Sequence, residues 1–96
     1  MDTFRMKIST PESCVFDGPV ESLVAPGVAG AFGVLAHHAP MIAAIDEGVL
    51  RASAAGVSIF FSVGKGVLEV TGDLVCVLTG KASRGVSPDE VVSQVP

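Results

Sequence analysis

The feature that most constrains the fold of this 96-residue chain is a series of short segments in which apolar and polar residues alternate. In the first segment, FRMKIS, the apolar Phe4, Met6 and Ile8 point one way and the polar residues the other, as in a half-buried strand. The pattern recurs in CVF, VESLVA, the Ala31–Leu35 run, MIAAI, VLRAS, VSIFFSV, VLEV and LVCVLT. Turn residues bound these segments at Asp17-Gly18-Pro19, Pro26-Gly27, Glu47-Gly48, Ala55-Gly56, Gly64-Lys65-Gly66 and Thr71-Gly72-Asp73. About nine short strands, spaced roughly 8 to 10 residues apart, predict an all-β, antiparallel sandwich or barrel.

The C-terminal end departs from this rhythm. Ser87 is a favourable helix N-cap, Pro88 suits the first helical position, and Glu90 follows three residues after the cap. The VVSQVP that comes next allows two helical turns at most, which are marginal without packing. We therefore predict a β-sandwich domain over residues 1–86 and a short tail over residues 87–96 that begins a helix.

Composition narrows the class of protein. The net charge is −4, the six basic residues are scattered, and Trp and Tyr are absent, which argues against a nucleic-acid groove. Apolar residues make up 49% of the chain, so we expect some apolar surface to stay exposed for a partner. No apolar run approaches the roughly 18 residues that span a bilayer, and residues 1–10 lack a signal-peptide core. A soluble, non-exported protein is expected.

The two cysteines lie far apart, as expected of a protein from a reducing compartment. Cys76 lies within LVCVL, where the simplest interpretation is a small buried apolar residue. Asp46 and Glu47 precede Gly48 in a sequence that indicates a solvated hairpin turn.

The stretch GAFGVLAHHAP, residues 30–40, holds the residues that metal sites and catalytic bases use. If it is extended, His37 and His38 face opposite sides and do not share one metal ion. They are the candidate bases, and sequence alone leaves open a distant serine beside them, but small sandwiches seldom build triads.

Glycine spacing does not favour a phosphate site either. Gly27, Gly30 and Gly33 do not form the dinucleotide fingerprint, and Gly64-Lys65 is followed by Gly66 instead of the Ser or Thr of a P-loop. We predict no catalytic, cofactor-binding or metal-binding residues.

Taken in order, the stretches TPESCVFDGPVESLVAPGVAGAFGVLAHHAPMIAAIDEGVLR, FFSVGKGVLEVTGDLVCVLT and KASRG resemble the epsilon subunit family of F-type rotary ATP synthases, over about residues 7–90. The resemblance implies a ten-stranded sandwich in the central-stalk rotor that contacts the gamma subunit and the membrane c-ring. It implies a non-catalytic peripheral subunit on the cytoplasmic face of a bacterial inner membrane that couples ion transport to ATP synthesis. A free-standing β-sandwich module that binds a ligand or protein is the alternative, although such modules usually present Trp or Tyr platforms.

This chain differs from the family pattern in three ways. The sequence past Glu90 has no room for the family's C-terminal helical hairpin, whether by natural shortening or by truncation, so little inhibition of ATP hydrolysis is expected of this chain. Ala31 stands where many members have an acidic residue, and His37 stands where glycine is usual before HAP.

By resemblance, the gamma and c-ring contact is predicted to be a rigid bumper at one end of the sandwich. Gly30 and Gly33 make the turn, Ala31 and Phe32 form an apolar tip, and His38 bonds backbone. The predicted contact residues are Gly30, Ala31, Phe32, Gly33, His38, Ala39, Pro40 and Met41.

Overall fold

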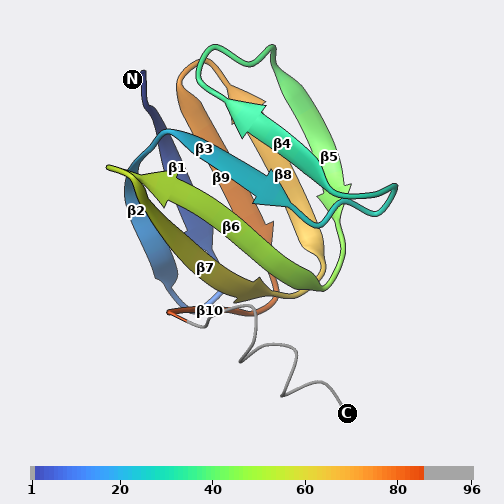
Figure 1. Cartoon of the computed structure of the whole chain (residues 1–96). Coiled ribbons are helices and arrows are strands. Elements are labelled where there is room, and N and C mark those ends of the chain that lie inside the picture. Colours follow the sequence, from blue (N-terminus) through green and yellow to red (C-terminus); the bar gives the residue numbers. More distant parts are fainter. Residues whose placement is uncertain (1, 86–96) are drawn as a thin grey trace.

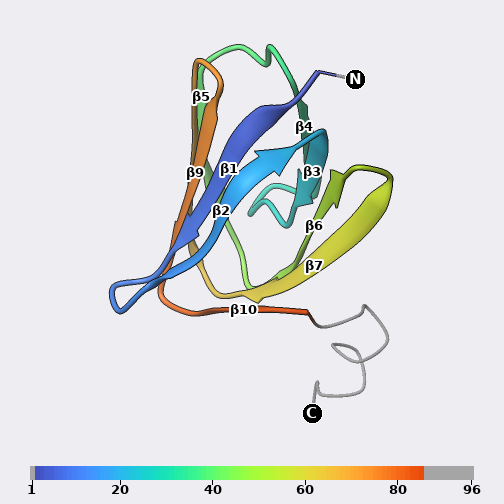
Figure 2. The same ribbon diagram turned by 90° about the vertical axis from the view of Figure 1, so that its left-hand side faces the viewer.

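The computed structural model describes residues 2–85 as ten strands in two five-stranded sheets that pack face to face (Figures 1 and 2). The strands are β1 (Phe4–Ser9), β2 (Cys14–Val20), β3 (Ser22–Ala25), β4 (Phe32–Leu35), β5 (Met41–Ile45), β6 (Gly48–Ala54), β7 (Val57–Val63), β8 (Gly66–Thr71), β9 (Leu74–Thr79) and β10 (Ala82–Arg84). The all-β sandwich prediction is confirmed. The predicted helical stub lies outside the described residues.

The first sheet has the strand order β2-β1-β9-β8-β5 and the second the order β10-β7-β6-β3-β4. Neighbouring strands pair antiparallel, with the exception that β1 pairs parallel with β9. The predicted antiparallel sandwich thus contains one parallel pair. No crossover helix is needed there, because most of the sandwich lies between these two strands in the chain.

Alternation along each strand produces the core between the sheets. Phe4, Met6 and Ile8 are buried as predicted, and Phe61 is the largest fully buried side chain. Cys76 is half-buried on the outer face of β9, because its neighbours in sequence supply the inward-facing side chains. The prediction that Cys76 is a core residue was wrong, since the period of two places it outside.

The predicted turn at Asp17-Gly18-Pro19 is instead part of β2. Proline has no backbone N–H to donate. An edge strand such as β2 tolerates Pro19, because one side of the strand has no neighbouring strand to accept a hydrogen bond. Arg5 on β1 donates two hydrogen bonds to Asp17, from Nε to Oδ1 and from Nη2 to Oδ2, both at 2.7 Å. These bonds hold the pKa of Asp17 below its ordinary value. The edge is thus occupied by proline and a paired charge, which disfavours pairing with another chain.

The predicted hairpin turn at Asp46 and Glu47 joins β5 to β6, which belong to different sheets. It is a crossing between layers, and the Asp46 amide donates a hydrogen bond to the Pro26 carbonyl at 2.7 Å. Glu47 is exposed, and its Oε2 lies 3.3 Å from the Nζ of Lys81. The hairpin prediction was therefore wrong, while the solvated position of Glu47 agrees with the structure.

A second crossing, between β7 and β8, contains Gly64-Lys65-Gly66. A Cβ at Gly66 would lie far inside van der Waals contact with the Leu78 carbonyl oxygen of β9. Thr79 is 6% exposed, and its hydroxyl lies 3.2 Å from the Lys65 carbonyl oxygen and 3.1 Å from that of Lys81. This corner is closely packed backbone to backbone, which explains its glycines.

Candidate functional site

The predicted contact stretch does not form one surface, because β4 runs through it. Gly30 and Ala31 lie in the β3–β4 loop, whereas His38 and Pro40 lie in the β4–β5 loop. Figure 1 shows these two loops at opposite ends of β4. The prediction of a single bumper at one end of the sandwich was therefore wrong in its geometry.

The β3–β4 loop turns on two glycines, and the sequence marked both of them, Gly27 in the Pro26-Gly27 turn and Gly30 in the predicted bumper. Gly30 has a φ of 125°, as predicted for a turn glycine. Gly33 instead lies within β4 and pairs with Val24. The second required glycine is Gly27, because a Cβ there would lie 2.5 Å from the Gly30 carbonyl oxygen and 2.8 Å from the Phe32 ring.

Phe32 does not form an exposed tip. It is half-buried, packs against the core and covers Gly27. The large exposed apolar side chain of this loop is Val28, which is 64% exposed and which the sequence interpretation missed. The Val28 amide donates to the Ala44 carbonyl at 3.1 Å, so the loop is attached to the edge of β5.

In the β4–β5 loop the two histidines have separate partners. His37 Nε2 lies 2.9 Å from Asp2 Oδ2, and His38 Nδ1 lies 2.7 Å from the Ala39 carbonyl oxygen. The backbone partner of His38 agrees with the prediction. In the part of the chain that the structure describes, no three potential metal ligands come together.

His37 has a φ of 65°, in the left-handed region that favours glycine. We expect His37→Gly to leave the free energy of unfolding near that of the wild type, because relief of backbone strain offsets the greater entropy of the unfolded chain. His37→Ala should be about 1 kcal/mol less stable than the glycine variant, because alanine keeps the strain. Urea unfolding measures both, and equal stabilities would show that this backbone is not strained.

A further apolar surface lies on the outer face of the first sheet. Ala44, Val67 and Leu78 are direct cross-strand neighbours on β5, β8 and β9. Ile42 lies two residues before Ala44, so its side chain is on the same side of β5. Ile42 is 72%, Leu78 56% and Val67 41% exposed. We call these four residues the apolar outer face.

Sequence reasoning missed the apolar outer face, although a signal was present. Apolar residues occupy both odd and even positions in the segments MIAAI, VLEV and LVCVLT. This pattern indicates strands with apolar surroundings on both faces. Because the second face is exposed here, these segments point to a surface that a partner covers.

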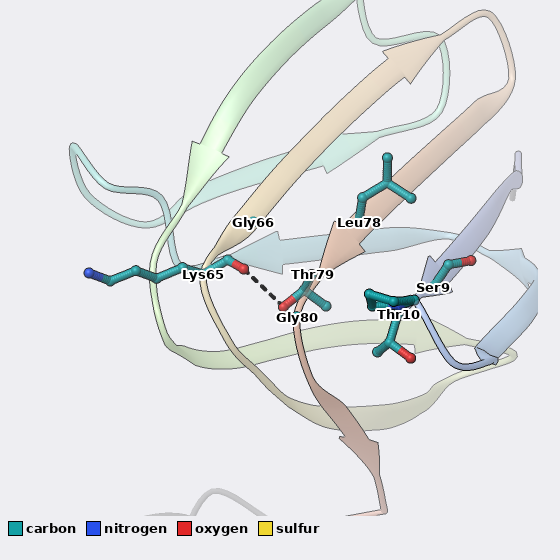
Figure 3. A pocket seen from close by; sticks show the side chains of 8 residues that line it. Ser9, Thr10, Lys65, Gly66, Leu78, Thr79 and Gly80 are labelled. Carbon is teal, nitrogen blue, oxygen red and sulfur yellow. Dashed lines mark hydrogen bonds between the residues drawn. The ribbon is translucent and has the colours of Figure 1, made fainter.

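A shallow, open hollow of about 410 Å³ adjoins this face at Leu78 (Figure 3). It lies where the ends of β1 and β9 meet the start of β8. Its lining consists of Ser9, Thr10, Pro11, Lys65, Gly66, Leu78, Thr79 and Gly80.

A small sandwich that exposes apolar side chains across three adjacent strands has the kind of surface by which domains dock to other proteins. Within residues 2–85, no helix is long and apolar enough to cross a membrane. The chain belongs to the ATP synthase delta/epsilon chain family: the profile described as "ATP synthase, Delta/Epsilon chain, beta-sandwich domain" matches residues 3–85.

Two of the similar curated proteins are named ATP synthase epsilon chain. An ATP synthase epsilon chain of Carboxydothermus hydrogenoformans is 40% identical over 88 residues, which are 92% of this chain and 66% of the relative. Another, of a Synechococcus strain, is 36% identical over 92 residues, which are 96% of this chain and 67% of the relative. The chain thus spans about two thirds of the length of these relatives. The family resemblance read from the sequence is confirmed.

Solved structures share the fold. A chain in the Euglena gracilis mitochondrial ATP synthase OSCP/F1/c-ring structure superposes with a TM-score of 0.81 at 17% identity, covering 95% of this chain and 60% of that one. A chain in the Tetrahymena thermophila mitochondrial ATP synthase central stalk/c-ring structure has a TM-score of 0.68 at 15% identity, covering 81% and 63%. These likenesses support the two-sheet architecture.

Proposed function

We propose that this chain is the β-sandwich part of a non-catalytic rotor subunit of an F-type ATP synthase. It joins the gamma subunit to the c-ring, so that rotation driven by ion flow reaches the catalytic head. The similar solved structures are an OSCP/F1/c-ring assembly and a central stalk/c-ring assembly, which supports this arrangement. As a component of a membrane-associated complex, it is proposed to lie at the cytoplasmic face of a bacterial inner membrane.

The observation that carries the proposal is the apolar outer face on a domain of this family. Ile42, Val67 and Leu78 expose apolar area that a stalk subunit would bury against its partner. We assign this face to the gamma subunit. Met41, the residue before Ile42, points to the opposite side of β5 and packs against the core. The β4–β5 loop before it, with His38, Ala39 and Pro40, is proposed to border the same contact.

The β3–β4 loop is the proposed contact with the c-ring. Ala31 and Val28 are exposed there, and neither carries a charge. Gly27 forms a bridge with Ile45, which together with the Val28 amide fixes the loop beside β5. A rigid, uncharged loop contacts its partner through shape and apolar burial, so salt should affect the contact little.

The test is assembly of the wild-type chain with the gamma subunit, followed by native mass spectrometry. We expect a complex with one copy of each chain, and the same fraction bound at low and at moderate salt. A chain that stays alone at micromolar concentrations would contradict the proposal and favour the free-standing binding module. Loss of the complex at moderate salt would show that ion pairs, and not the apolar outer face, carry the contact.

A further inference from the structure

The two sheets have four edge strands, and within residues 2–85 three of these edges are blocked or covered. On β2, Pro19 and a paired charge disfavour a further strand. The β3–β4 loop covers part of β5, because the Val28 amide donates to the Ala44 carbonyl at 3.1 Å. β10 ends after three residues at the charged Arg84. The fourth edge, β4, contains neither proline nor charge (Figure 1).

The backbone of β4 directs two amides and two carbonyls away from its sheet. Neighbouring residues of a strand point their N–H and C=O groups to alternate sides. The Ser53 carbonyl of β6 accepts the amide just before β3 at 2.7 Å, so Arg51, two residues earlier, also faces β3. Val24, across from Arg51, therefore faces β6, and Gly33, across from Val24, faces outward. Leu35, two residues after Gly33, faces outward as well.

This outward edge is unpaired in the part of the chain that the structure describes. No backbone hydrogen bond from a turn or loop reaches Gly33 or Leu35, and the Leu35 side chain is 64% exposed. A Cβ at Gly33 would meet only the Leu23 carbonyl oxygen, at 3.7 Å, so packing within the domain does not require a glycine there. Glycine inside a strand often marks the close approach of another backbone. The edge of β4 is therefore suited to pairing with a strand from outside the domain.

We propose that the occupant of this edge is β4 of a second copy of the chain, paired antiparallel about a two-fold axis at Val34. In this register Gly33 lies directly across from Leu35 of the second copy, and Leu35 lies across from its Gly33. The outward amides and carbonyls of both residues then form four hydrogen bonds between the copies. Each exposed Leu35 side chain covers the glycine backbone opposite it, so the two unpaired features of the edge complement each other.

The residues around β4 favour a second copy over a charged partner. The segment 31–36 has no charged residue, so identical strands bring no like charges together. A two-fold pairing uses the same patch on both copies and stops at a dimer. The contact is small, so we expect a weak, reversible dimer. It uses the second sheet, whereas the apolar outer face lies on the first, so the inference goes beyond the proposed function and does not depend on it.

The test removes one outward N–H without breaking the ladder to β3. Gly33→Pro deletes an amide that points away from the sheet, a position at which an edge strand tolerates proline. The matched control is Gly33→Ala, which keeps the amide and adds a Cβ at ordinary contact distance. A second pair is Leu35→Lys and its control Val57→Lys, which replace side chains of the same sheet that are 64% and 62% exposed. Circular dichroism establishes which variants are folded.

Sedimentation equilibrium of the full 96-residue chain then measures dimerisation. We expect a dissociation constant of about 100 µM for the wild type. Gly33→Pro and Leu35→Lys should weaken the dimer at least about tenfold, and the two controls should stay within about threefold of the wild type. If Gly33→Pro does not fold, the Leu35→Lys and Val57→Lys pair decides.

Two outcomes would overturn the proposal. One is a wild-type chain that remains monomeric up to about 1 mM, roughly ten times the expected dissociation constant. The other is a dimer that persists in the folded edge variants, which would place the contact on another surface such as the apolar outer face. Neither outcome bears on gamma binding, which is measured separately, so the proposed function stands or fails on its own test.

Discussion

Replacement of Gly66 by alanine is expected to destabilise the domain by about 3 kcal/mol or more. The added Cβ would overlap the Leu78 carbonyl oxygen, which is backbone and cannot rotate away. Gly66 pairs with Thr79 across β8 and β9, so relief requires these two central strands to separate locally. Their ladder hydrogen bonds would then be lost together with packing.

Gly80→Ala is the matched control for this loss of stability. Gly80 lies at the same corner, but its added Cβ would meet no atom within 4 Å. The control should therefore be neutral or slightly stabilising, because alanine reduces the entropy of the unfolded chain. Urea unfolding of both variants gives the difference, and a Gly66→Ala variant within about 1 kcal/mol of the wild type would contradict the expected overlap.

Strand positions were the part of the fold that the sequence predicted best. FRMKIS, VSIFFSV and LVCVLT coincide with β1, β7 and β9. Each of these strands buries one face, so alternation in the sequence reflects directly which side chains contact the core. The same alternation places Cys76 on the outer face, between the buried Val75 and Val77, although its apolar neighbours suggested burial.

Pairing partners were harder to predict, because local turn signals do not say which strands meet. The residues Asp46 and Glu47 mark a reversal of the chain, but such a reversal can close a hairpin or cross between sheets. Asp17-Gly18-Pro19 has a turn composition, yet an edge position in the sheet accommodates it within β2. Long-range contacts, which sequence periodicity does not contain, decide these cases.

The candidate site was predicted in part. The exposed loop with Gly30 and Ala31, and the backbone partner of His38, agree with the structure. The strand pattern of FGVL already placed a strand between Gly30 and His38. The prediction of a single contact overlooked that a strand of this length puts its two flanking loops at opposite ends. Ile42 and Leu78 escaped notice because only the folded sheet brings residues from β5 and β9 onto one surface.

The second large effect is expected on assembly. The double variant Ile42→Asp/Val67→Asp places two carboxylates on the apolar outer face, and we expect it to weaken binding to the gamma subunit by more than about 100-fold. Burying a charge without a partner against an apolar contact is costly, which accounts for the size of the effect. Both side chains are exposed, so the core between the sheets stays intact.

The matched control is Leu35→Asp/Val57→Asp, which removes the same kind of exposed apolar area from the other sheet, where these side chains are 64% and 62% exposed. It adds the same two charges, and each aspartate within a strand lowers the free energy of unfolding by a similar amount, about 1 kcal/mol.

Fluorescence anisotropy with labelled gamma subunit compares the binding of the two double variants. Loss of binding in both double variants would show that net charge or stability causes the effect. Retained binding in the Ile42/Val67 double variant would exclude the apolar outer face as the contact. Selective loss in that pair is expected, because neither introduced carboxylate has a cation directly across a strand: Val67 lies between Ala44 and Leu78, and Ile42 lies across from Glu69.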